Sequence, residues 1–451
     1  MVNTNLEILQ KFKNIDSLEV LTNPNDLKRL SKDFYSYSPR LKSKLEGCIA
    51  DLVVRPKNVQ AVLEVVKICW AFSLPLTIRG SGTGNYGQSV PLSGGVVMQM
   101  NYLNKVESIC KDTGFVKVQT GCLMGQLNSD LQQKGRELRL LPSTWKTATI
   151  GGFLAGGSGG IGSIKWGFLR DPGNLIGLDL ITMDENPQLI ELDAQQSEPI
   201  NHAYGTNGII TSVMISTDIR HYWHSIIIDC NSLRESIDVL KICMGTAVEL
   251  KLGTILEKDI VEQMPKWFKE YSVLDKVLIQ STLEGIRTIE MICRKYNLTT
   301  HILGIEDDLE NGLNDLVWNH TTLQLRAKDK SWTYLQMLLP LDKEMELINN
   351  LKIVHGRKIL WHIEAVSQNG FPRLAALPVL KWTNKNELYE IIDLCKRYGA
   401  IIFNPHVLTV EGGGLGVVDA DQVKAKNTYD PKGLLNPGKL EGWNKKEKYI
   451  I

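Results

Sequence analysis

Two glycine-rich stretches give the chain places where a phosphate group or a flat ring could be held. The first, residues 79–87, reads Arg-Gly-Ser-Gly-Thr-Gly-Asn-Tyr-Gly. Successive backbone N–H groups in such a stretch can converge on an anion, because glycine adopts unusual φ angles without steric penalty. The hydroxyls of Ser81 and Thr83 add side-chain donors. The stretch therefore predicts a pyrophosphate site, and a long glycine-rich hairpin is the alternative.

The second stretch, residues 149–162, suits a planar group. It has seven glycines between Gly151 and Gly162, and the residues among them are mostly small. Such a backbone can lie flat against one face of a large ring, for example the isoalloxazine of a flavin. Tight packing between two subdomains would also need these glycines, and the two interpretations are compatible.

Both stretches match the dinucleotide fingerprint GxGxxG, but neither has the context that gives the fingerprint its meaning. The matches are Gly82, Gly84 and Gly87, and Gly157, Gly159 and Gly162. In a Rossmann fold a helix follows the glycines, and its N-terminus holds the pyrophosphate. After Gly87 the chain instead reaches a β-like run, and after Gly162 it meets another turn-rich stretch. A Rossmann fold is therefore disfavoured, and a nicotinamide-dependent enzyme remains an alternative.

The elements around these stretches are short and alternate between helix and strand. The patterns predict helices over 59–72 and 123–134, a turn at 141–143, and strands over 74–78, 95–100, 175–183 and 208–218. Both glycine-rich stretches then belong to one N-terminal domain, which we expect over residues 1–222.

After about residue 222 the pattern of predicted helices and strands changes. Rounds of strand, helix and strand follow one another over residues 223–254, 276–305 and 334–365. Such a run predicts a sheet with helices on one face, and we expect a separate cap domain over 223–400. Glycine becomes frequent again near the end, which predicts that a segment over 401–451 returns to the first domain.

Composition excludes several classes of partner and site. The chain has 51 basic and 50 acidic residues and no long basic run, so no nucleic-acid partner is expected. The eight cysteines form no CxxC pair, which argues against a zinc ribbon or an iron–sulfur cluster. Scattered thiols favour a reducing compartment. No signal-peptide region or apolar membrane span is evident, so we expect a cytoplasmic protein without a transmembrane segment.

Four ordered segments resemble the FAD-binding domain of the p-cresol methylhydroxylase (PCMH) type, which belongs to the vanillyl-alcohol oxidase superfamily. They are TIRGSGTG at 77–84, TIGG at 149–152, YGTNGIITSV at 204–213 and LNPGK at 435–439. Glycolate oxidase and D-lactate dehydrogenase-like FAD-linked oxidases are the most similar subgroup. The resemblance implies an α+β fold, in which a PCMH-type two-subdomain FAD-binding domain is joined to a ferredoxin-like α/β cap domain.

The resemblance also implies which residues hold FAD. The pyrophosphate would rest on the first stretch, the isoalloxazine against the second, and the adenine on the backbone of residues 208–210. Asn436 and Lys439 are candidates for stabilising the negative charge that reduction places near N1 of the ring. The implied cofactor-binding residues are Arg79, Gly80, Ser81, Gly82, Thr83, Gly84, Ser143, Thr149, Gly151, Gly152, Gly156, Gly157, Ser158, Gly160, Gly208, Ile209, Ile210, Asn436 and Lys439.

Two positions bear on how the flavin is attached. Family members with covalent flavin use a histidine in the first loop, where this chain has Thr83. Relatives with a second bond use a cysteine ahead of the second loop, where this chain has Trp145. Neither residue can form such a bond, so the resemblance implies dissociable FAD. Cys122 is expected to be a buried thiol.

The substrate side resembles the family less. Lactate- and hydroxyglutarate-type members have a Glu-His-Gly element that places a histidine, and in some members a metal ligand, beside the substrate. This chain has Glu411-Gly412-Gly413 there, and we expect no metal site.

Other residues could supply the missing chemistry. His320 and His406 are the candidate general bases, and Arg326 or Arg373 could bind a substrate carboxylate. For each of them an ordinary core or surface role is the alternative.

The activity implied is oxidation of a small 2-hydroxy acid or a related alcohol, with hydride transfer to N5 of the flavin and an unidentified electron acceptor. The alternative is a flavin-binding, non-catalytic subunit of a larger dehydrogenase complex. A glycine in place of the family's histidine, and a partner subunit, would suit that second function.

Overall fold

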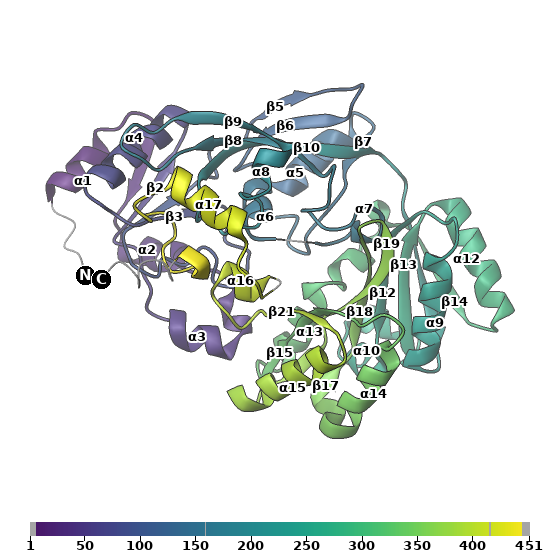
Figure 1. Cartoon of the computed structure of the whole chain (residues 1–451). Coiled ribbons are helices and arrows are strands. Elements are labelled where there is room, and N and C mark those ends of the chain that lie inside the picture. The colour runs from purple at the N-terminus through teal and green to yellow at the C-terminus, as the bar shows by residue number, and fades with distance from the viewer. Residues whose placement is uncertain (1–5, 158, 415, 444–451) are drawn as a thin grey trace.

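The computed structural model describes residues 6–157, 159–414 and 416–443, and its N-terminal half contains two sheets (Figure 1). The first sheet has the strand order β1 (Leu18–Leu21), β2 (Leu52–Pro56), β4 (Val96–Gln99) and β3 (Leu76–Arg79). Strands β2, β4 and β3 are parallel, because helix α4 (Val59–Ala71) makes the connection from β2 to β3. Asn58 caps α4 by accepting the Ala61 N–H at 2.8 Å. The first glycine-rich stretch therefore begins where β3 ends.

The second sheet is antiparallel and lies beside the first. Its strands are β5 (Val106–Ile109), β6 (Phe115–Gln119), β10 (Ile209–Ile219), β8 (Leu175–Ile181) and β9 (Leu189–Asp193), with β7 (Arg136–Leu138) paired to β10. Helices α5 (Met124–Gln132) and α6 (Ile150–Gly156) share its hydrophobic core. The central strand β10 thus connects the sheet core to the segment that precedes it, residues 202–208.

The third sheet has eight antiparallel strands and forms the cap. Its order is β14 (Thr300–Ile305), β11 (His224–Cys230), β13 (Asp275–Ser281), β12 (Leu250–Leu256), β18 (His362–Gln368), β19 (Phe371–Ala376), β16 (Gln336–Leu338) and β21 (Ile401–Phe403). The pleat of β11 separates the two faces, since Ile226 and Ile228 enter one core and Ile227 enters the other. A small sheet of β15 (Trp332–Tyr334), β20 (Val379–Lys381) and β17 (Ile359–Leu360) lies beside it.

Four helices cover one face of the large sheet. They are α9 (Leu233–Met244), α12 (Leu283–Lys295), α14 (Glu344–His355) and α15 (Lys385–Arg397). The other face packs into the core that contains α5 and α6, so the N-terminal half covers it. The fold is mixed α+β, as the sequence predicts. Within the ranges that the structure describes, no helix is long and apolar enough to cross a membrane.

The C-terminal segment lies next to the N-terminal sheet. Helices α16 (Val410–Gly413) and α17 (Ala420–Tyr429) are drawn in yellow beside the purple β2 and β3 in Figure 1. Leu76 of β3 donates its N–H to the Leu434 carbonyl at 2.8 Å and accepts the Asn436 N–H at 2.9 Å. Residues 434–436 therefore pair with the strand that leads into the first glycine-rich stretch.

Two local predictions differ from the structure. Residues 149–162 were expected to be a loop, but their first half forms helix α6, because Thr149 caps it and accepts the Gly152 N–H at 3.2 Å. The round predicted over 334–365 was expected to open with one strand, but that segment is divided between β15 and β16, which belong to different sheets. The domain boundaries at residues 222 and 400 stay predictions.

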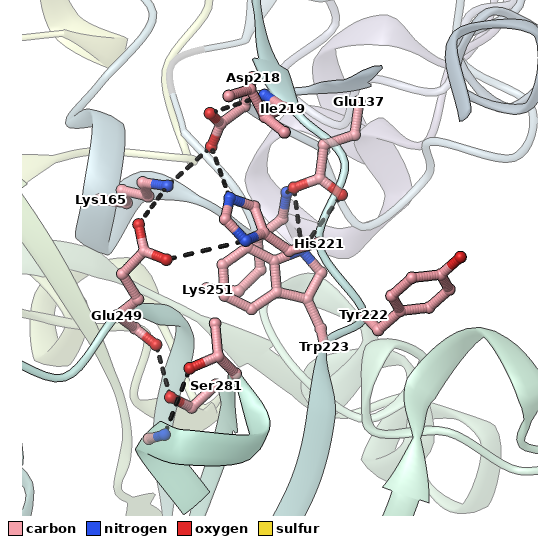
Figure 2. A network of polar contacts seen from close by, with 12 residues as sticks. Glu137, Lys165, Asp218, Ile219, His221, Tyr222, Trp223, Glu249, Lys251 and Ser281 are labelled. Atoms are coloured by element: carbon pink, nitrogen blue, oxygen red, sulfur yellow. Dashed lines mark hydrogen bonds and ion pairs between the residues drawn. The ribbon is translucent and has the colours of Figure 1, made fainter. Parts of the chain in front are cut away.

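A polar network joins the cap to the N-terminal half (Figure 2). Glu137 of β7 accepts the Trp223 indole N–H at 2.9 Å and the Lys251 ammonium at 2.9 Å. Nearby, Lys165 is 2.8 Å from both Asp218 and Glu249. Since Lys251 and Glu249 lie at the start of β12 whereas Glu137 and Asp218 belong to the second sheet, these ion pairs connect the two halves of the molecule.

Candidate functional site

A cavity lies where the two glycine-rich stretches meet residues 202–210 and the start of helix α13 (Asn319–Lys328). His320 is on its wall. Thirteen of the residues predicted to bind the cofactor also line it: Gly80, Ser81, Gly82, Thr83, Gly84, Ser143, Thr149, Gly151, Gly152, Gly156, Gly157, Gly208 and Ile210. Ser158 lies outside the described residues. The fold therefore gathers most of the predicted positions around one space.

The first stretch is shaped by close approaches that glycine allows. Gly82 has a φ of +71°, a region that favours glycine. A Cβ at Gly80 would lie 2.1 Å from Thr149 Oγ1, so the stretch rests directly on the start of α6. Arg79 is not on the cavity wall, because its guanidinium donates to the Lys32 carbonyl at 2.7 Å and to Ser89 Oγ at 3.0 Å. Burial lowers the pKa of Arg79 to about 10.

The second stretch presents helix backbone to the cavity. A Cβ at Gly151 would lie 1.5 Å from Thr120 Oγ1, which explains why no larger residue fits at the first turn of α6. Gly160 has a different role and is not on the wall. A Cβ there would lie 2.1 Å from the Leu141 carbonyl, beside the β-bridge between Leu141 and Ile161.

Residues 202–208 form a further wall of the cavity, in which the sequence motif indicated the part from Tyr204 onward but not His202. His202 donates its N–H to the Leu154 carbonyl at 2.9 Å and Tyr204 donates to the Ala155 carbonyl at 2.8 Å, so the segment follows α6. Both residues have positive φ angles, 56° and 54°. Burial lowers the pKa of His202 to about 4, so its imidazole is neutral near pH 7. The nearest signal in the sequence was the YGTNG motif, which begins just after His202.

Three residues on the cavity wall have buried polar atoms without a partner among the described residues: Tyr204 through its hydroxyl, Trp318 through Nε1 and Asn319 through Oδ1. Such atoms are rare in folded proteins and suggest that a ligand supplies their partners. All three groups are neutral hydrogen-bonding groups.

On the cap side, a buried carboxylate fixes the start of α13. Trp318 has a φ of +52°, and its N–H donates to Glu364 Oε1 at 2.7 Å. The same carboxylate contacts His362 Nε2 at 2.7 Å and accepts the Thr254 hydroxyl at 2.5 Å. Glu364 and His362 are both 0% exposed. Strand β18 therefore positions the turn from which Asn319 and His320 reach the cavity.

A backbone contact indicates which ring nitrogen of His320 carries the proton. Its Nδ1 lies 3.2 Å from the Asn314 carbonyl, which can only accept. Nδ1 therefore holds the proton in the neutral ring, and the lone pair is on Nε2.

Two of the proposed catalytic residues lie elsewhere. His406 is fully buried, with Nδ1 2.8 Å from Ser38 Oγ and Nε2 2.9 Å from the Tyr334 carbonyl, and it does not line the cavity. Arg326 is at the far end of α13 and donates to the Trp332 and Ser36 carbonyls. Neither residue lines the cavity that His320 lines, and both side chains already have partners, which are backbone carbonyls for Arg326 and a carbonyl and the Ser38 hydroxyl for His406.

The two C-terminal candidates, Lys439 and Asn436, form hydrogen bonds to the backbone at the end of the first stretch. Lys439 is fully buried and donates to the carbonyls of Gly87, Gln88 and Val90. Asn436 donates to the Gln88 carbonyl at 2.8 Å and to the Tyr204 carbonyl at 2.7 Å. These two residues are absent from the lining of the cavity, so their role at the ring stays a prediction, and so does the role of Ile209 at the adenine.

The wall as a whole fits a flavin dinucleotide. Glycine backbone and the hydroxyls of Ser81, Thr83 and Thr149 offer donors to phosphate oxygens, and aromatic side chains from distant segments offer faces to flat rings. These aromatic residues include Tyr37, Tyr86 and Phe403, which no sequence pattern connects.

Comparison with known proteins agrees with this geometry. A family model described as an FAD binding domain matches residues 50–188. The chain is 24% identical to the glycolate oxidase subunit GlcD of Bacillus subtilis (strain 168), over 90% of this chain and 91% of that protein. It is 30% identical to a D-lactate dehydrogenase of Anaerostipes hadrus, over 37% of this chain and 33% of that one. A mitochondrial D-2-hydroxyglutarate dehydrogenase of Rattus norvegicus is 25% identical over 55% of this chain and 45% of its own.

Among solved structures, alkyldihydroxyacetonephosphate synthase has a similar fold, with a TM-score of 0.74 at 17% identity, over 96% of this chain and 85% of that chain. The family match, the relatives and the shared fold all agree with a cavity built from the two glycine-rich stretches. The chain is therefore an FAD-binding oxidoreductase of the PCMH type, homologous to glycolate oxidase GlcD and to D-lactate and D-2-hydroxyglutarate dehydrogenases.

Proposed function

We propose that the protein oxidises the CH–OH group of a small 2-hydroxy acid or a related alcohol, with FAD held without a covalent bond. The observation behind this proposal is that His320 lies on the same cavity wall as the two glycine-rich stretches. Relatives named for glycolate, D-lactate and D-2-hydroxyglutarate support the class of reaction.

Each part of the reaction has a counterpart in the cavity. When bound, FAD supplies the acceptor for the hydride, and thus for the two electrons, that leaves the carbinol carbon. His320 Nε2 takes the hydroxyl proton, so that the alcohol becomes a carbonyl compound. The Asn314 carbonyl holds the imidazole in the tautomer that this step needs.

Non-covalent binding is supported by the side chains near the ring site. Thr83 lines the cavity where covalent relatives have histidine. Cys122 does not line it, and burial raises the pKa of that thiol to about 11. We expect acid precipitation of the yellow protein to leave the flavin in the supernatant. Colour in the pellet would contradict this part of the proposal.

The base is tested by His320→Gln, which keeps a polar side chain but cannot take up a proton. We expect the rate of flavin reduction by a substrate under anaerobic conditions to fall about a hundredfold or more, with FAD content unchanged. His224→Gln, which changes a histidine outside the cavity lining, is the matched control. A variant that reduces its flavin at the wild-type rate would remove His320 from the mechanism.

A second candidate function is that of a flavin-binding subunit without its own substrate chemistry, working beside a catalytic partner. It is favoured by Gly412, which stands where lactate-type relatives have histidine, and by the description of GlcD as a subunit. Flavin reduction by any hydroxy acid or alcohol would exclude it.

Because the eight cysteines are all unpaired, we also infer a reducing, cytoplasmic compartment.

A further inference from the structure

We propose that the substrate oxidised in this cavity is uncharged, an alcohol whose carbinol carbon bears a neutral group instead of a carboxylate. This inference rests on the proposed function and narrows its substrate class. It comes from the chemistry of the cavity wall, from the partners of three cations that could have met a carboxylate, and from the carboxylate at the start of α13.

The cavity wall is neutral at the cap side. The cap contributes Trp318, Asn319, His320, Leu323, Gln336, Leu377 and Phe403. Among the residues that the structure describes, no lysine, arginine, aspartate or glutamate lines the cavity. A carboxylate bound at the cap side, away from the glycine-rich backbone, would lose hydration without gaining a charged partner, which is unfavourable.

The cations that could have met a carboxylate have other partners. Arg326 donates to two backbone carbonyls and lies 4.8 Å from the centre of the Tyr37 ring. Arg373 donates to Gln368 Oε1 at 2.9 Å and to the Leu339 carbonyl at 3.0 Å. Lys439 is buried behind the first glycine-rich stretch. To reach the substrate, each side chain would have to break these hydrogen bonds.

The start of α13 already has a carboxylate beside it. A helix N-terminus attracts negative charge, but here the Glu364 carboxylate already accepts the Trp318 N–H. Two of the N–H groups that follow donate within the turn, His320 to the Val317 carbonyl and Thr321 to the Trp318 carbonyl. A second carboxylate placed beside this turn would meet the buried charge of Glu364.

The unpartnered groups of the cap suit a neutral ligand. Trp318 is 6% exposed and its indole N–H can donate, whereas the Asn319 amide can both donate and accept. Hydroxyl and amide groups of a substrate can pair with both of them. The carboxylate oxygens of a hydroxy acid can only accept, so they leave Asn319 Oδ1 without a donor.

The oxidation step is the same as in the proposed function, and only the substrate class is narrower. The C–H bond of the carbinol breaks with its electron pair, which FAD takes up as hydride, and the hydroxyl proton passes to His320. The substrate becomes a ketone or an aldehyde.

Matched pairs of probes test the proposal in the FAD-loaded protein. Lactate is compared with lactamide, and mandelate with mandelamide, each as both enantiomers. In each pair the carbinol carbon is the same and the charge differs. Bleaching of the flavin is followed anaerobically by stopped flow. We expect the amide of a pair to reduce the flavin at least tenfold faster than the acid at equal concentration.

The other outcomes separate two kinds of failure. If the acid reduces the flavin as fast as its amide or faster, the proposed function stands and the uncharged substrate is wrong. If neither member of any pair reduces a flavin that dithionite still reduces, the proposed function fails, and the substrate class fails with it.

A charge added to the wall gives an independent test. Leu323 lines the cavity and is 45% exposed, so Leu323→Arg has room for its side chain. We expect this variant to raise the acid-to-amide ratio of reduction rates about tenfold or more, because a guanidinium pairs with a carboxylate. Ile353→Arg, on the exposed side of α14 at 83% exposure, is the control and should leave the ratio unchanged. An unchanged ratio in Leu323→Arg would place the charge-selective part of the site elsewhere and overturn the proposal.

Discussion

At the scale of single residues, the two histidines suggested as bases differ in what their ring nitrogens contact. His320 has one nitrogen held by a carbonyl and the other available. His406 has both nitrogens bonded within the core, and burial lowers its pKa to about 4. A proton on His406 would disrupt that arrangement, so this residue contributes to stability and not to proton transfer.

The pKa of His406 predicts how stability depends on pH. The ordinary value is 6.5, so between about pH 6.5 and 4 the unfolded chain binds the proton and the folded chain does not. The free energy of unfolding should therefore fall as pH decreases through this window, by about 1.4 kcal/mol per pH unit for this group. His202, with its pKa also lowered to about 4, acts in the same direction. Asp33, whose pKa burial raises to about 6, acts in the opposite one.

A variant can measure how much His406 contributes to the pH dependence of the free energy of unfolding. His406→Gln keeps a hydrogen-bonding side chain and removes the titration. Urea unfolding at several pH values should show a flatter slope for the variant between pH 6.5 and 4 and parallel curves above pH 7. Equal slopes across the whole range would contradict the assignment.

At the scale of elements, helix α13 depends on strand β18. Glu364 of β18 accepts the N–H of the residue before the helix, and that residue has a positive φ. A non-glycine residue in such a conformation is strained by about 1–3 kcal/mol, so the surroundings must hold it. Glu364 is in this sense a positioning residue for His320.

Replacement of Glu364 should separate stability from positioning. Glu364→Ala removes the partner of the Trp318 N–H, His362 and the Thr254 hydroxyl, and it should lower the free energy of unfolding by about 3 kcal/mol. Glu364→Gln retains an acceptor and should restore most of the flavin-reduction rate. The measurement is the reduction rate at saturating substrate, because misplacement of His320 lowers that rate more than it weakens binding. Equal rates in the alanine and glutamine variants would assign Glu364 a role in stability alone.

The sequence predicted elements better than it predicted their partners. Helix 59–72 and the strands around the first stretch were visible because Asn58 marks a cap and apolar residues repeat at helical spacing. Ten of the thirteen lining residues lie within the ordered motifs, which is why the sequence could predict them. The helix within 149–162 was missed because its glycines favour a loop, and packing against Thr120 decides otherwise. His202 and Glu364 were missed because their roles depend on contacts between distant segments.

At the scale of the whole molecule, the cap is joined to the N-terminal half by buried ion pairs. The side chains of Lys251 and Glu137 are 5% and 4% exposed, and the Trp223 indole completes the group. Removal of one member of a buried pair leaves a charge without a partner, which is strongly destabilising.

Lys251→Met should therefore lower the free energy of unfolding by about 3–5 kcal/mol. Addition of Glu137→Gln should recover much of that loss, because the buried charge is gone and the amide oxygen of the new side chain can still accept the Trp223 indole N–H. Urea unfolding of the two single variants and the double variant checks this. Losses that simply add in the double variant would show that the pair is not coupled.

The return of the C-terminal segment to strand β3 has a consequence for biosynthesis. Lys439 binds the Gly87 carbonyl across 352 residues of sequence. During translation, residues 50–188, which match the FAD-binding family, leave the ribosome long before the segment that braces their glycine-rich loop. The cofactor loop thus acquires this support only after Lys439 has been synthesised, so we expect flavin uptake to follow the synthesis of the C-terminal segment.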